Sequence, residues 1–126
     1  NEITIKQQIL SKLDEQYANA FKQVTESLNN QIKQSKDVNP EQVANIQNSL
    51  EDLAKETVGI KPDDQPREEK MKTWKEKFKI FAKYAVKALP KTAATLALFT
   101  PLTAPFSKQI EEGLQSVVEG IQVGMD

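Results

Sequence analysis

Residues 71–89 read MKTWKEKFKIFAKYAVKAL, and an apolar side chain recurs there at every third or fourth position. This spacing is typical of an amphipathic α-helix, because residues three and four apart lie on the same helix face. The predicted helix runs from about Pro66, which suits a first helical turn, to Leu89, and Pro90 ends or kinks it. Its apolar face comprises Met71, Trp74, Phe78, Phe81, Ala82, Ala85 and Leu89.

The chain upstream contains two further helical patterns. Ile3, Leu10, Tyr17 and Val24 recur every seven residues, and Leu13, Ala20, Phe21 and Leu28 fill the adjoining stripe. These two stripes predict one long helix over residues 2–34. A second helix is predicted from Pro40, behind the capping residue Asn39, to about Val58, and Gly59 ends it.

Downstream, residues 92–107 read TAATLALFTPLTAPFS and carry no charge, although 28% of the chain is charged. A helix of this length rises about 24 Å, less than the roughly 30 Å hydrocarbon core of a bilayer. Pro101 and Pro105 interrupt it further, so we expect a short helix at residues 91–100 in a buried hairpin. Insertion into a membrane after the bundle opens is the alternative. The contact candidates here are Leu96, Leu98, Phe99, Leu102 and Phe106.

A terminal helix is predicted over residues 105–124, and Gly113, Gly120 and Gly124 lie close to one line along it. A glycine inside a helix costs about 1 kcal/mol relative to alanine, so this line needs a reason. Three explanations stay open: close approach of another helix, adaptability in a segment that changes environment, and fraying after Gly120. Gly113 and Gly120 are counted among the candidate membrane or partner contacts.

No window alternates apolar and polar residues as a half-buried strand does. The sequence therefore predicts an all-α fold, an antiparallel bundle of four main helices plus one short helix. Its 126 residues are expected to form a single domain, 1–126, cut from a longer protein.

Charge is concentrated in one part of the chain. Residues 67–91 contain Arg67 and eight lysines against three glutamates, a net charge of +6 in a chain of net charge −1. One interpretation is a basic helix for an anionic membrane or acidic partner, with Trp74, Phe78 and Phe81 as its apolar anchor. The other interpretation makes the aromatic face core and the lysines a solvated face. The candidate contacts on this helix are Lys72, Lys75, Lys79, Lys83 and Lys87.

The residue inventory disfavours catalysis. The chain has no histidine, no cysteine, no glycine-rich phosphate loop and no Glu-x-x-His metal motif. Neighbouring carboxylates such as Asp14 and Glu15 point about 100 degrees apart on a helix, which suits solvated faces and helix starts better than an acid–base pair. We expect no enzyme activity, cofactor, metal or small-molecule substrate. The near-neutral net charge also argues against a nucleic-acid partner.

The run KALPKTAATLALFTPLTAPFSKQIEEGLQ, residues 87–115, follows the basic helix. In character it resembles the helical effector or adaptor modules of bacterial NLR-like defence proteins, including those similar to fungal HeLo and related four-helix cell-death domains. The resemblance implies activation by oligomerisation and action on a membrane, and it transfers no site residues. Those domains typically carry their membrane-active hydrophobic helix at the N-terminus, whereas residues 2–34 here are polar and charged.

Two functions follow as expectations. The first is a non-enzymatic module that associates with itself or a protein partner and engages an anionic membrane through its C-terminal half. Its location would be cytoplasmic or peripheral at the membrane. The alternative is a soluble adaptor that pairs through the long first helix, with Leu10, Val24 and Leu28 in the interface.

Overall fold

The computed structural model describes residues 2–61, 68–89 and 100–103, and every regular element in these ranges is a helix. The helices are α1 (Gln7–Leu10), α2 (Glu15–Gln34), α3 (Pro40–Thr57), α4 (Glu68–Ala88) and α6 (Thr100–Thr103). The prediction of an all-α fold is confirmed for this part of the chain. The predicted helix at 105–124 and most of the one at 91–100 lie outside the described residues.

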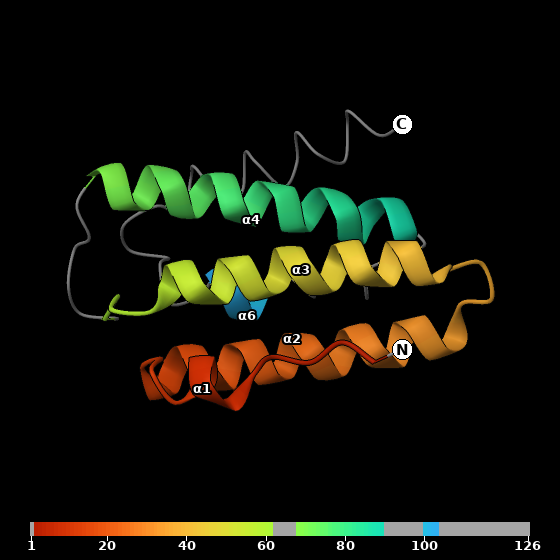
Figure 1. Cartoon of the computed structure of the whole chain (residues 1–126), viewed down its shortest axis with the longest axis horizontal. Helices are drawn as coiled ribbons and strands as arrows, with labels where there is room; N and C mark the ends of the chain where they lie inside the picture. Colours follow the sequence, from red (N-terminus) through yellow and green to blue (C-terminus); the bar gives the residue numbers. More distant parts are fainter. Residues whose placement is uncertain (1, 62–67, 90–99, 104–126) are drawn as a thin grey trace.

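The three long helices lie side by side, with α3 between α2 and α4 (Figure 1). Each of these helices runs opposite to the one before it. The α3 and α4 helices pack along one another, and α6 packs against α2. Their facing apolar stripes form one continuous core.

The predicted helix over residues 2–34 is wrong in its first third. Residues 2–6 are extended, α1 is a single turn, and α2 begins only after Asp14, whose side chain accepts a hydrogen bond from the backbone N–H of Gln16 at 3.2 Å. A continuous helix would carry its first thirteen residues about 20 Å beyond the start of α2. Folding back instead buries Ile3 and Ile9, and burial of apolar area stabilises the folded-back arrangement.

The α3 helix begins as its sequence predicts. Asn39 Oδ1 accepts from the N–H of Gln42 at 2.8 Å, Gln42 Oε1 accepts from the N–H of Asn39 at 3.0 Å, and Pro40 occupies the first turn. This reciprocal pair is a capping box. The helix ends one residue earlier than predicted, at Thr57, and Gly59 follows with a φ of +90°, a left-handed conformation that glycine tolerates.

Replacing Asn39 with alanine is expected to lower the free energy of unfolding by about 1 kcal/mol, because the N–H of Gln42 loses its acceptor. Urea denaturation followed by circular dichroism measures the change. Asn48, an exposed residue further along α3, provides the matched control, and its replacement by alanine should leave stability within about 0.5 kcal/mol. Equal losses for the two variants would contradict the capping role.

The α4 helix contributes Trp74, Phe78 and Phe81, three of the four largest fully buried side chains in the described ranges. All seven residues of its predicted apolar face are buried, and the described helix starts at Glu68. The Trp74 ring stacks on Phe78 with centroids 5.4 Å apart. Its Nε1–H donates to Thr57 Oγ1 at 2.9 Å, and that hydroxyl donates to the carbonyl of Leu53 at 2.7 Å. The interpretation of this aromatic face as core is therefore confirmed, and its interpretation as a membrane anchor is wrong for this structure.

The uncharged insert is described only at its centre. Pro101 lies in the first turn of α6, where its missing N–H breaks no intrahelical bond. Leu102 is buried. Leu96, Leu98, Phe99, Phe106, Gly113 and Gly120 lie outside the described residues, so their roles stay predictions.

Candidate functional site

The outer face of α4 gathers most of the lysines that the sequence singled out. Lys72, Lys79, Lys83 and Lys87 are exposed, whereas Lys75 is half-buried at the flank. The last three of the exposed lysines are spaced by four residues, and Lys72 stands seven residues before Lys79. This spacing places the four ammonium groups along one stripe of the helix, which we call the lysine row.

Two apolar side chains lie next to the lysine row. Ile80 is 48% exposed and Tyr84 is 38% exposed, and within the described ranges they are the large hydrophobic residues most open to solvent. They are one helical turn apart, so they are neighbours on the helix surface, and Ile80 precedes Lys83 by three residues as Tyr84 precedes Lys87. The face therefore combines cationic groups with an apolar pair.

The charge of α4 is unevenly distributed along its length. Residues 68–88 hold seven lysines and three glutamates, a net charge of +4, and the glutamates Glu68, Glu69 and Glu76 all lie in the first half. Lys70 belongs to the fold, because its Nζ lies 3.1 Å from Glu56 Oε1 on α3. The second half carries lysines without acids, and these also stabilise the negative end of the helix dipole.

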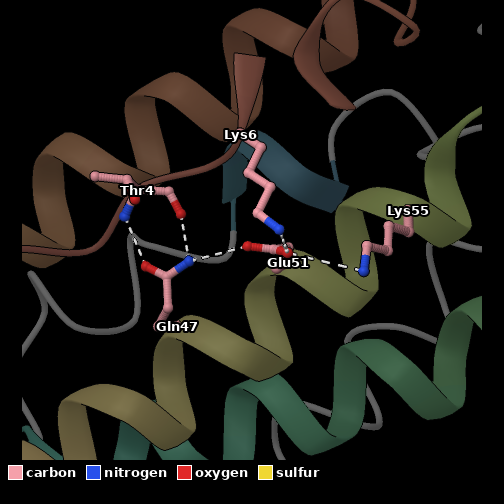
Figure 2. Close-up of polar contacts among 5 residues, drawn as sticks. All are labelled: Thr4, Lys6, Gln47, Glu51 and Lys55. Atoms are coloured by element: carbon pink, nitrogen blue, oxygen red, sulfur yellow. Dashed lines mark hydrogen bonds and ion pairs between the residues drawn. The ribbon is translucent and has the colours of Figure 1, made fainter. Parts of the chain in front are cut away.

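A second cluster of polar contacts holds residues 2–6, which we call the strap. Asn29 on α2 uses both ends of its amide on one residue: Oδ1 accepts from the N–H of Ile3 at 2.7 Å and Nδ2 donates to the carbonyl of Ile3 at 2.9 Å. Gln47 on α3 binds Thr4 in the same way: its Oε1 accepts from the N–H of Thr4, and its Nε2 donates to the carbonyl of Thr4 (Figure 2). The two amides pair with the strap backbone as a neighbouring β-strand does.

Charged groups surround the amide of Gln47. Glu51 lies between the ammonium groups of Lys6 at 3.8 Å and Lys55 at 3.7 Å, and it accepts from Gln47 Nε2 at 3.3 Å (Figure 2). The two lysine side chains are 69% and 58% exposed, so each ion pair contributes at most about 1 kcal/mol. The amide pairs and the burial of Ile3 therefore provide most of the strap's attachment.

An open pocket of about 460 Å³ lies between the strap and α2. Its walls include Glu2 and Ile5 from the strap and Lys22, Glu26 and Lys33 from α2. Charges of both signs occur in this lining. No sequence pattern predicted either the pocket or the roles of Asn29 and Gln47, because each amide binds a residue that is distant along the chain.

The adaptor alternative depends on residues that the structure places inside. Val24 and Leu28 on α2 are fully buried in the core, and Leu10 on α1 is half-buried against it. Val24 and Leu28 are occupied by intramolecular packing and offer no surface for a partner helix in this structure, whereas Leu10 keeps part of its surface open.

Across residues 2–61, 68–89 and 100–103, no three His, Cys, Asp or Glu side chains gather closely enough to hold a metal ion. None of the helices in these ranges is both long enough and apolar enough to cross a bilayer.

Comparison of the chain with models of protein families, with curated proteins and with solved structures found no match.

Proposed function

We propose that this domain is a non-enzymatic helical interaction module that binds an anionic membrane surface through the outer face of α4. The observation that carries the proposal is the juxtaposition of the lysine row with the exposed pair Ile80 and Tyr84. A solvated helix face accounts for the lysines alone. It does not account for two large apolar side chains beside them, which an interfacial helix inserts among the lipid headgroups.

The four lysines of this face are expected to strengthen binding to an anionic membrane substantially. Each lysine close to an anionic lipid surface contributes about 1 kcal/mol, so Lys72, Lys79, Lys83 and Lys87 together supply about 4 kcal/mol, or roughly a thousandfold in affinity. Lysine stems also extend along apolar surface while the ammonium groups stay at the headgroups. Insertion of Ile80 and Tyr84 adds burial of apolar area.

The resemblance of residues 87–115 to HeLo-like cell-death modules also supports membrane binding, since such modules act on membranes after oligomerising. We further propose that the predicted helix at 105–124 is the fourth long helix of an antiparallel bundle, with α2, α3 and α4 as the other three. In this proposal the lysine row makes the first contact with lipid, and the candidates at residues 96–106 and the two glycines act afterwards.

Replacing Lys79 and Lys83 together with glutamine is expected to weaken binding to vesicles of mixed neutral and anionic lipid about thirtyfold, because two contributions of about 1 kcal/mol are lost. Co-sedimentation with vesicles at low salt measures the affinity. The matched control replaces the exposed lysines Lys12 and Lys36, which lie outside α4, with glutamine, so that both variants have the same net charge. Binding of the control should stay within about threefold of the unaltered protein, since its lysine row is intact.

Three results would count against the proposal. They are no binding of the unaltered protein to anionic vesicles, equal binding to neutral vesicles, and an equal loss in the control variant. Replacing Ile80 with serine separates the two parts of the face, because it leaves every charge in place. It is expected to weaken binding by a smaller factor that does not vary with salt.

A further inference from the structure

We propose that the groove between α2 and α3 is a binding site for an extended peptide, and that it takes the strap of a second copy of this chain in reciprocal exchange. The hinge of this exchange is the break between α1 and α2 at residues 11–14. The site uses a different part of the molecule from the α4 face and requires no lipid, so the inference stands independently of the proposed membrane binding.

The groove recognises a backbone more than a sequence. Asn29 and Gln47 each bind the N–H and the carbonyl of one strap residue, and these groups exist in any extended peptide. Specificity comes from the fully buried side chain of Ile3 and from the charge of Lys6 beside Glu51. A second copy carries all of these features, and its strap forms the same contacts in the same groove.

The hinge contains no residue that prevents it from becoming helical, although Leu13 is buried in the closed form. Residues 11–14 are Ser, Lys, Leu and Asp, and the chain contains neither glycine nor proline before Pro40. The seven-residue recurrence also continues through the break from Leu10 to Tyr17. The sequence thus supports two states of this segment: the closed break, and a continuous helix that joins α1 to α2 and directs the strap away from its own groove.

Exchange conserves most of the interactions of the monomer. The contacts of residues 2–10 are lost within one copy and formed again with the other, which is the usual basis of domain swapping. The difference lies at the hinge, where the Asp14 cap on Gln16 is given up and one helical turn is gained. Substitutions of Asp14, the cap, and of Glu15, the first residue of α2, are therefore expected to shift the equilibrium between the closed and the exchanged form.

Two hinge substitutions test this in opposite directions. Replacing Asp14 with alanine removes the cap of the closed form. Because each of the two copies loses about fivefold in preference for that form, the dimer association constant should rise roughly thirtyfold. Replacing Glu15 with proline leaves the closed form intact, since Glu15 is the first residue of α2 and Asp14 already has the extended φ and ψ of −57° and 145° that precede a proline. It prevents the continuous helix and should lower the association constant a hundredfold or more.

Sedimentation equilibrium of the full chain without lipid measures these constants, and circular dichroism checks that each variant is folded. The variant combining Asp14→Ala with Ile3→Asp identifies the exchanged segment, and it is expected to return to monomer because its strap no longer fits a groove. The inference is overturned if Asp14→Ala remains monomeric at millimolar concentration. It is equally overturned if Glu15→Pro dimerises like the unaltered chain, or if adding Ile3→Asp leaves the dimer of Asp14→Ala unchanged.

Discussion

Replacing Trp74 with alanine is expected to lower the free energy of unfolding by about 4 kcal/mol, the range for deleting a large aromatic side chain from a packed core. Trp74 is 1% exposed, stacks on Phe78, and donates a hydrogen bond to Thr57 on α3. Its removal leaves a cavity between the two helices with the most extensive mutual packing among those described. Chemical denaturation monitored by circular dichroism measures the loss.

Thr57→Val is the matched comparison for this site, because valine keeps the shape of the side chain and lacks the hydroxyl. We expect a loss of about 1–3 kcal/mol, because valine removes the acceptor of the buried Trp74 N–H and leaves that donor unsatisfied. The gap between the two variants separates the packing of the indole ring from its polar contact. A loss below about 1 kcal/mol for Trp74→Ala would mean that the ring is not part of the core, and the aromatic face of α4 would again be available for a membrane.

Replacing Ile3 with alanine is expected to cost about 3 kcal/mol, although the residue lies near the start of the described chain. Its side chain is fully buried, and the amide of Asn29 holds its backbone in place. If residues 2–34 formed one helix, residue 3 would lie far beyond the bundle, and its truncation would cost nothing measurable. The size of the loss therefore distinguishes the strap from a continuous helix.

Ile5→Ala provides the control, because Ile5 belongs to the same strap and is only partly buried. Its loss should be less than half that of Ile3→Ala. Hydrogen exchange adds a local measurement: the N–H of Thr4 should lose protection in Ile3→Ala while amides in the middle of α3 keep theirs. Equal losses in stability for the two variants would show that Ile3 has no specific pocket.

The helices that the sequence predicted best are those with signals at both ends. α3 has Asn39, Pro40 and Gln42 at its start and Gly59 just after its end, so its boundaries follow from local chemistry. The apolar face of α4 was predicted residue by residue, because each large side chain on that stripe has to be buried against something. The helix over residues 2–34 failed because its apolar periodicity continues from Leu10 to Tyr17, although Asp14 and Glu15 are residues that suit a helix start.

The candidate site likewise has features with a local signal in the sequence and features without one. The lysines of α4 were predicted as contacts from the charge of residues 67–91, and their spacing places four of the five on one helix face. The exposure of Ile80 and Tyr84 was not predicted, because their burial depends on which neighbours cover α4. Asn29 and Gln47 gave no signal at all, since an amide in a helix becomes a backbone clamp only when another segment lies across it.

By itself the sequence determined that this protein is built of helices, where α3 and α4 run, and which face of α4 is cationic. These properties depend on residues within one or two helical turns of each other, and local spacing is visible in a sequence. Only the tertiary structure decided that residues 2–6 are not helical and lie against α2 and α3. That choice depends on contacts between distant parts of the chain: Ile3 with Asn29, 26 positions later, and Thr4 with Gln47, 43 positions later. The burial of Ile3 and the pairing of its backbone outweigh the local preference for a longer helix.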